Sequence, residues 1–390
     1  MATWSGYSVL YLMVTTWAIY SYSNVFFLFG PYLEKIGFSP ETTGILLGAF
    51  YAATTLTRPL GGFITEFAGI SRALFFSGAI CLAAAMFNFV TMSFAPLLLI
   101  RIAMGAAFSV FVVALTTYQS ISIPEEKRGM IFALVTIGSL ACLFTVVPLV
   151  DILLQNGHDT LFLAIPVSMA ALCVAMSRYL PPAPKISKDD EKWGTWGELY
   201  HETPFWRIVA SCTMFGLCDA SVVSLPALLQ SMNLSSSSFF VANGLGALVM
   251  RTFGMKFFNT HARFMVAGPS LIVMAVFLYM TTLAGNNVQL FIYAFFYGAG
   301  MGYGFPAHLS LVGDLAPARL RSKSSVLVHF CNDSGWFILP VYVGVITSLI
   351  GAAGAFRAMA ALCAMFGVGL SIMWVLYNRR VSVQKHSRRR

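Results

Sequence analysis

Ionisable side chains inside long apolar runs are the residues of this chain with the clearest potential for chemistry. Asp219 and Arg101 each lie within such a run, and in a third run Asp333 follows His329 by four positions. A charged group at the centre of a membrane helix costs about 2.5–3.5 kcal/mol on insertion scales. Each of these residues therefore needs either a partner or a function.

Asp219 is the strongest candidate for a group that changes its charge. At 1.5 Å per residue it lies about 16 Å into its apolar run, close to the middle of a bilayer. Protonation would remove the charge that hydrocarbon disfavours. We therefore predict that Asp219 carries a proton or binds a cation, and that it also contributes to substrate binding. The alternative is a fixed salt bridge with an arginine such as Arg101.

His329 and Asp333 are spaced to share one face of a helix. Because imidazole titrates near neutral pH, we assign the pair to proton coupling beside Asp219. The alternative is that this stretch, which includes Asn332 and Gly335, serves helix packing.

Four further residues are candidates for substrate binding. Arg101 can hold an anionic group, and Asn24 and Tyr303 can line a mixed pocket for an amphiphilic solute. His308 follows a glycine-rich run, residues 298–304, which we expect to loosen the helix and to provide a bend for gating. A histidine bonded to a backbone carbonyl is the alternative for His308.

The composition indicates which elements hold these residues. With 58% hydrophobic residues, 10% charged residues and a mean hydropathy of +0.77, the surface must be covered by lipid rather than water. The 390 residues leave room for about twelve membrane helices and little else. We predict an all-α membrane protein with spans at residues 6–34, 40–67, 72–92, 95–122, 129–153, 159–180, 207–230, 236–258, 264–284, 288–315, 322–349 and 354–378.

Catalysis, metal binding and cofactor binding are all disfavoured. The seven cysteines lie far apart in apolar runs and never form a CxxC pair. The sequence has no Gly-x-Ser-x-Gly, no HExxH and no phosphate loop, and its six histidines lack a short metal-binding spacing. We therefore predict no enzyme, no metal site and no cofactor.

The net charge of +9 is distributed unevenly along the predicted spans. Nearly all lysines and arginines fall in alternate loops and the tail, whereas the opposite side has only Lys35 and Arg357. By the positive-inside rule, both termini are predicted to be cytoplasmic in a plasma (bacterial inner) membrane. The basic tail is expected to set topology or contact lipid headgroups rather than nucleic acid. We expect a monomer in the lipid bilayer.

The sequence divides into two similar halves joined by a polar linker. Residues 182–206 form the linker, and its tryptophans favour a short helix at the membrane interface. Residues 1–181 and 207–390 are predicted to form two pseudo-symmetric six-helix bundles. At an offset of 193 positions, five residues of the first half recur in the second: Arg58 as Arg251, Gly61 as Gly254, Gly105 as Gly298, Pro124 as Pro317 and Arg128 as Arg321. Asn24 and Pro31 recur as Asp219 and Pro226 at an offset of 195.

The loop after the second predicted span resembles the signature of the major facilitator superfamily, Gly-x-x-x-acid-base-x-Gly-x-x-base. Gly62, Glu66, Gly69 and Arg72 match it, whereas Phe67 stands where the family usually has a basic residue. The stretch from Arg101 to Gly105 and the loop at 124–129 resemble further motifs of the family. Of the antiporter motif in span five, only Gly138 and Pro148 are present. The resemblance implies a twelve-span fold and, within the superfamily, the drug and metabolite efflux branch related to arabinose-efflux permeases.

Residues near this loop are predicted to form a conformational gate. Glycines at 61 and 62 would let the second span approach a neighbouring helix closely. Glu66 would face a helix N-terminus or Arg128 when the halves are closed on that side. The predicted gate residues are Arg58, Gly62, Glu66, Gly69, Arg72, Arg128 and Arg251.

Three functions are consistent with these features. The first is a proton-coupled exporter, an antiporter, of a small-molecule drug or metabolite, with siderophore-like chelators among the candidates. The second is a proton-coupled importer, a symporter, of an organic anion held by Arg101. The third is a receptor or scaffold on the same fold that transports nothing.

Overall fold

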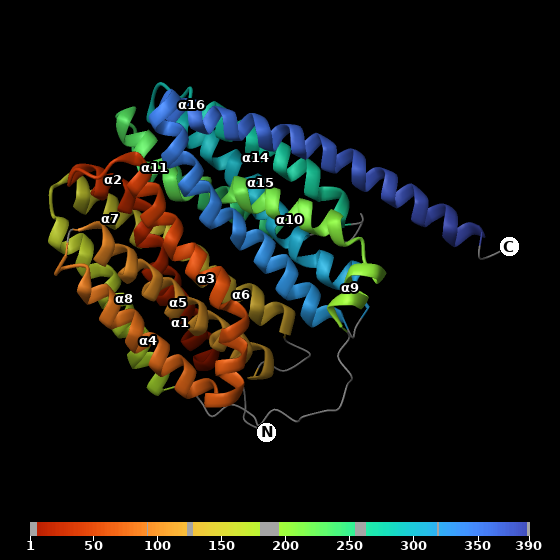
Figure 1. Ribbon diagram of the computed structural model, residues 1–390, viewed down its shortest axis with the longest axis horizontal. Helices are drawn as coiled ribbons and strands as arrows, with labels where there is room; N and C mark the ends of the chain where they lie inside the picture. The colour runs from red at the N-terminus through yellow and green to blue at the C-terminus, as the bar shows by residue number, and fades with distance from the viewer. Residues whose placement is uncertain are drawn as a thin grey trace. The chain divides into compact units, whose positions relative to one another are not determined.

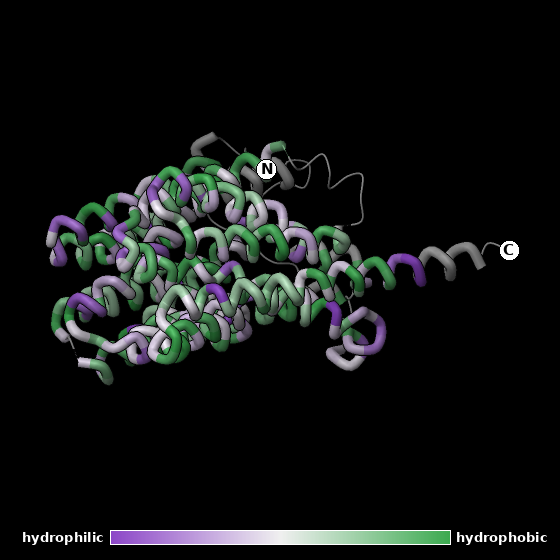
Figure 2. Tube along the Cα trace, turned by 90° about the horizontal axis from the view of Figure 1, so that it is seen from above, coloured by the Kyte–Doolittle hydropathy of each residue, from purple (hydrophilic) through white to green (hydrophobic). Residues whose placement is uncertain are grey.

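The structure is a computed structural model that describes residues 6–91, 93–122, 128–179, 195–253, 263–317 and 320–387. Every regular element within those ranges is a helix (Figure 1). Hydrophobic residues dominate along the helices, whereas hydrophilic residues gather mostly near helix ends (Figure 2). The predicted all-α membrane fold is confirmed.

The helices of the first half correspond to six spans. The first span comprises α1 (Gly6–Asn24), the 3-10 turn η1 (Val25–Leu28) and α2 (Phe29–Lys35). The next three are α3 (Pro40–Ala68), α4 (Ile70–Phe87) and α5 (Phe94–Ser122). The fifth comprises α6 (Arg128–Phe144) and α7 (Val146–Gln155), and the sixth is α8 (Asp159–Arg178).

The helices of the second half repeat this pattern after the short helix α9 (Trp196–Glu202). The first span of this half comprises α10 (Phe205–Asp219) and α11 (Ser221–Ser231), followed by α12 (Ser236–Phe253). The third is η3 (Arg263–Val266) with α14 (Ala267–Thr281), and the fourth is α15 (Asn287–Leu315). The last two form α16 (Arg321–Ser387), which Gly351 divides by adopting φ 78° and ψ 161°.

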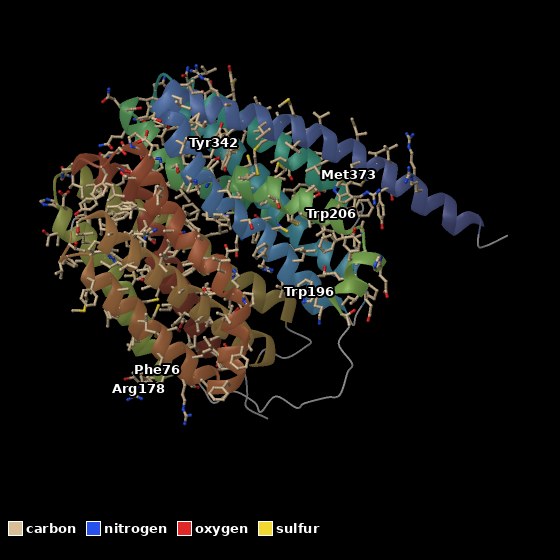
Figure 3. All side chains as sticks on the ribbon, viewed as in Figure 1. Phe76, Arg178, Trp196, Trp206, Tyr342 and Met373 are labelled. Atoms are coloured by element: carbon tan, nitrogen blue, oxygen red, sulfur yellow. The ribbon has the colours of Figure 1, made fainter. Side chains whose placement is uncertain are left out.

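Within the described residues, these helices account for the predicted twelve spans. Eight stretches are long and apolar enough to cross a membrane, and one of them, Val326–Arg380, contains the break at Gly351 and so holds two spans. Helices α3, α12 and α15, which carry more polar residues, complete the set. Large apolar side chains stay exposed along the twelve spans; Phe76 on α4, for example, is 61% exposed (Figure 3). Lipid is the natural cover for such surfaces.

The repeat detected in the sequence is visible in the helix geometry. Helix α1 ends at Asn24 and α10 ends at Asp219, so the first span of each half breaks at the equivalent position. A Cβ atom placed on Gly105 would lie 2.9 Å from the carbonyl carbon of Phe50, and one on Gly298 would lie 2.6 Å from that of Asn243. The two contacts differ by 193 positions at both ends, which is the offset of the sequence repeat.

The glycine-rich run of α15 packs tightly on two sides. Cβ atoms on Gly298 and Gly302 would collide with the backbone of α12, at Asn243 and Ala247. Cβ atoms on Gly300 and Gly304 would meet side chains of α14 at 2.7–2.8 Å. Helix α15 is continuous from Asn287 to Leu315, with Pro306 inside it, and the run serves close helix approach; the predicted bend for gating stays a prediction.

The chain forms two compact units whose boundaries do not follow the midpoint of the sequence. The first comprises residues 1–189, 222–241 and 340–348, and the second comprises 190–221, 242–339 and 349–390. Helices α12 and α16 therefore each run through both units. Most of the predicted linker, residues 182–194, lies outside the described residues. The short helix expected near its tryptophans is present as α9, which begins at Trp196, 50% exposed; Trp206, 66% exposed, follows in α10 (Figure 3).

Candidate functional site

Asp219 lies at the break between α10 and α11 in the second unit. The break leaves backbone carbonyl groups without their helical donors. The hydroxyl group of Tyr297 on α15 donates to the carbonyl oxygen of Cys218 at 2.6 Å and lies 3.4 Å from that of Asp219. Tyr297 is itself fully buried, and its hydroxyl group ties the interrupted helix to α15.

Three side chains surround the Asp219 carboxyl group, which is only 5% exposed. The indole of Trp336 donates a hydrogen bond to it, and Arg251 and Asp333 lie close enough to interact with it electrostatically. Its Oδ1 atom is buried and has no hydrogen-bond partner among the described residues. Asp219 and Asp333, which were predicted from separate stretches of sequence, are thus brought together.

Arg251 reaches this cluster from α12. Its guanidinium carbon lies 5.9 Å from the ring centroid of Phe305 on α15. The sequence indicated Arg251 only as a gate residue equivalent to Arg58, and it did not indicate Trp336 as a partner of Asp219. The signal for Arg251 was its position inside an apolar helix, which calls for a nearby carboxylate. The sequence does not indicate which carboxylate lies near Arg251.

His329 and Asp333 lie one turn apart on α16, as their spacing predicts, and Trp336 follows on the same helix. All three side chains are partly exposed. Of the predicted proton-coupling pair, Asp333 interacts electrostatically with Asp219.

His308 lies on α15 within a local network. Its Nδ1 atom is 2.8 Å from the carbonyl oxygen of Gly304, one turn earlier, and its ring stacks on Phe215 with centroids 4.4 Å apart. With 2% of its surface exposed, His308 matches the alternative of a histidine held by a backbone carbonyl. Tyr303, on the same helix, is partly exposed.

Arg101 occupies an aromatic cage in the first unit. Its guanidinium carbon lies 4.4, 4.7 and 5.3 Å from the ring centroids of Phe26, Phe50 and Phe29. Nε donates to the carbonyl oxygen of Leu46 at 3.2 Å. The two terminal nitrogens have no hydrogen-bond partner among the described residues, although the side chain is fully buried. Cation–π attraction is therefore the main stabilisation that the surrounding groups offer this charge.

Asn24 ends α1 at the position equivalent to Asp219. Its Nδ2 atom lies 2.9 Å from the sulfur of Cys142 on α6, and its side chain is partly exposed. In the first half, a neutral amide thus takes the place of the carboxyl group.

The predicted gate residues lie around the turn between α3 and α4. Gly69 separates the two helices with φ 84°, a conformation that favours glycine. Close approach is confirmed for Gly61, whose Cβ would lie 3.3 Å from Val113, and is wrong for Gly62, which faces open space. Arg58 is partly exposed and Arg72 is exposed. The side chains of Glu66 and Arg128 lie outside the described residues, so the predicted contact between them stays a prediction.

Solved structures of membrane transporters share this fold. A nucleoside transporter, NupG, aligns with a TM-score of 0.77 at 11% identity, over 94% of this chain and 99% of that one. A peptide transporter, POT, in complex with sulfate aligns at 0.75 and 14% identity over 95% of each chain. A bacterial homologue of the human lysosomal transporter Spinster, in an inward-facing and occupied conformation, aligns at 0.72 and 14% identity over 96% of each chain.

Sequence comparison agrees with the fold. No curated protein matches the chain closely enough to count as a relative. The family model described as the Major Facilitator Superfamily matches residues 11–340 and, in a second match, 237–390. With the duplicated helices and a match across nearly the whole sequence, the chain belongs to the major facilitator superfamily of membrane transporters.

Proposed function

We propose that the protein is a proton-coupled exporter of a small amphiphilic drug or metabolite, with Asp219 as the group that binds the coupling proton. The observation that carries this proposal is the buried cluster around Asp219. It holds a carboxyl group that is 5% exposed, at a helix break, with one oxygen that lacks a hydrogen-bond partner among the described residues.

The charges of the cluster favour the binding of one proton. Asp219 and Asp333 together carry two negative charges when ionised, and Arg251 carries one positive charge. One bound proton brings these three side chains to zero net charge, which lowers the cost of enclosing them in a medium of low dielectric constant. The cluster thus has a loaded state and an unloaded state that differ in net charge.

A change of charge supplies a driving force for transport. In the proposed cycle, a proton enters from the outside, neutralises the cluster and permits the return of the empty protein. A membrane potential of 100 mV adds about 2.3 kcal/mol for each charge moved. Because of the distribution of its basic residues, we propose that the protein lies in a bacterial inner membrane with both termini in the cytoplasm.

A second candidate function, import of an organic anion with protons, is favoured by Arg101. Its terminal nitrogens have no hydrogen-bond partner among the described residues, so a carboxylate or phosphate that reached them would gain two charge-assisted hydrogen bonds. The full burial of Arg101 means that such an anion would need another conformation to reach it. For this reason we rank import below export.

The test begins with ligand binding by the purified protein. Amphiphilic drugs, siderophore-like chelators and organic anions are screened for thermal stabilisation at pH 6 and pH 8, since a ligand that binds the folded state raises its apparent stability. The best stabiliser is then followed in proteoliposomes with an imposed pH gradient. Proton-coupled export predicts that the compound moves in the direction opposite to the protons, whereas import with protons predicts that both move in the same direction.

A matched pair of variants makes the assay specific. Asp219→Asn is expected to abolish accumulation driven by the pH gradient. Asp159→Asn removes a carboxylate that is 34% exposed and paired with Lys35 at 2.7 Å, and is expected to leave accumulation unchanged. Binding without movement in any gradient would instead favour the receptor or scaffold.

A further inference from the structure

A second buried carboxylate, outside the cluster around Asp219, holds the start of α12 within the first unit. Asp151 on α7 is 6% exposed. Its Oδ2 atom accepts a hydrogen bond from the backbone N–H of Ser237 at 2.8 Å and another from the Ser237 hydroxyl at 2.6 Å. The sequence places these two residues 86 positions apart, so this contact joins distant parts of the chain.

The position of these bonds at a helix start makes them strong. Ser235 accepts from the N–H of Ser238 at 3.2 Å and so caps one of the first N–H groups of α12. Asp151 takes the neighbouring N–H of Ser237. A carboxylate at a helix N-terminus also interacts favourably with the helix dipole, and both of its hydrogen bonds are charge-assisted.

The other end of α12 carries Arg251. Fourteen residues separate Ser237 from Arg251, which corresponds to about 21 Å of continuous helix. Residues up to Val241 belong to the first unit and residues from Ala242 onward to the second. Helix α12 therefore runs without a break from the Asp151 contact to Arg251, which interacts electrostatically with Asp219.

Helix α16 provides a parallel connection. A Cβ atom on Gly344 would lie 2.5 Å from the carbonyl oxygen of Pro40, so α16 and α3 are in direct backbone contact within the first unit. The same helix carries Trp336, which donates to Asp219 in the second unit. Two neighbours of Asp219 thus lie on helices whose other ends are fixed in the first unit.

We propose that Asp151 is a positioning residue, a latch on α12 that couples the state of the Asp219 cluster to the separation of α7 from the start of α12. The coupling rests on the proposed role of Asp219. When the cluster changes its charge, the force on Arg251 is transmitted along α12, and the Asp151 contact resists movement until that force is sufficient.

A reporter thiol on α3 measures opening of the first unit at the contact of α3 with α16. Thr43 is 5% exposed on α3, next to Gly44, whose Cβ would lie 3.1 Å from the Gly344 backbone. Thr43→Cys is introduced into the full chain in lipid vesicles and treated with a membrane-impermeant maleimide. Peptide-resolved mass spectrometry separates labelling at position 43 from labelling of the native cysteines, all seven of which are buried.

The latch predicts a graded effect on the rate of labelling. Asp151→Asn is expected to raise the rate about tenfold, because it removes the charged acceptor of two hydrogen bonds. Ser237→Ala keeps the bond from the backbone N–H and is expected to raise the rate by a smaller factor. Ser235→Ala weakens the same helix start without touching Asp151, so it serves as the control and is expected to leave the rate unchanged. Equal rates in Asp151→Asn and Ser235→Ala would overturn the latch.

The coupling is tested by combining substitutions. Asp219→Asn is expected to change the labelling rate of the parent chain. In a chain that already carries Asp151→Asn, the same substitution is expected to change the rate by a factor at least about threefold smaller. Independent, multiplicative effects would overturn the coupling along α12. Failure of the proposed function is a separate result, seen when Asp219→Asn retains transport driven by a pH gradient. If Asp151→Asn does not fold, as judged by gel filtration, Ser237→Ala carries the same test.

Discussion

The substitution Gly298→Ala tests the close contact between α12 and α15. A Cβ atom at this position would lie 2.6 Å from the carbonyl carbon and 2.7 Å from the Cα atom of Asn243. Carbon atoms in favourable contact stand about 3.5–4.0 Å apart, so the two helices must separate by about 1 Å. Both atoms it meets belong to the backbone of α12, and rotation of a side chain cannot relieve the collision.

Two opposing effects set the size of the change in stability. Alanine favours a helix over glycine by about 1 kcal/mol. Overpacking of a rigid interface costs about 1–3 kcal/mol or more, and here it also separates the next glycine of the run, Gly302, from Ala247. We therefore expect Gly298→Ala to lower the free energy of unfolding by about 1–2 kcal/mol and to reduce the apparent melting temperature in detergent.

The controls come from the same chain. Gly62→Ala places a Cβ in open space within α3 and is expected to leave the melting temperature unchanged or raised. Gly105→Ala, the repeat equivalent of Gly298→Ala, is expected to be destabilising because its Cβ would meet the Phe50 backbone at 2.9–3.1 Å. Equal melting temperatures of Gly298→Ala and Gly62→Ala would contradict the close contact of α12 with α15 at Gly298.

Three further substitutions test other contacts. Arg101→Lys replaces the planar cation between three rings and is expected to lower stability by about 1–2 kcal/mol in thermal unfolding; a wild-type melting temperature would show that the cage contributes little. Trp336→Phe removes the donor to Asp219 and is expected to slow transport at an unchanged yield of folded protein, and normal turnover would argue against a role for this hydrogen bond. Gly351→Ala places a residue with a side chain at φ 78°, where no other atom lies near the added Cβ. The backbone strain is expected to cost about 1–2 kcal/mol of stability, and an unchanged melting curve would contradict the assigned break in α16.

The duplicated architecture could be predicted from the sequence because it depends on patterns along the chain. Apolar runs of sufficient length identify membrane helices whatever their neighbours are. The repeat offset found from Gly105 and Gly298 reappears in the contacts of these residues with Phe50 and Asn243. Only glycine fits at these positions without a shift, because the two helix backbones pass too closely for a side chain.

The pairings between helices could not be predicted in this way. Asp219 and Asp333 were recognised as costly charges, but the register between α10, α12 and α16 decides that Arg251 and Trp336 are their neighbours. Asp151 lies in an apolar run as well, and its partner is a backbone N–H group, which every residue except proline possesses.

The role of a glycine also depends on what lies opposite it. Gly61 and Gly62 are adjacent in the sequence, yet only Gly61 faces a neighbouring helix. The run at 298–304, which was expected to loosen its helix, packs closely against α12 and α14. Glycine permits both outcomes, and the packing surface selects between them.

The role of Asp219 in proton binding is tested by comparing the parent protein with Asp219→Asn in proteoliposomes that contain the best-stabilising compound. Two modes are measured, namely accumulation driven by a pH gradient and exchange of labelled for unlabelled compound without a gradient. A proton-binding Asp219 predicts that the variant loses accumulation at every pH while it still exchanges the compound. Accumulation at the parent rate across the pH range would contradict that role.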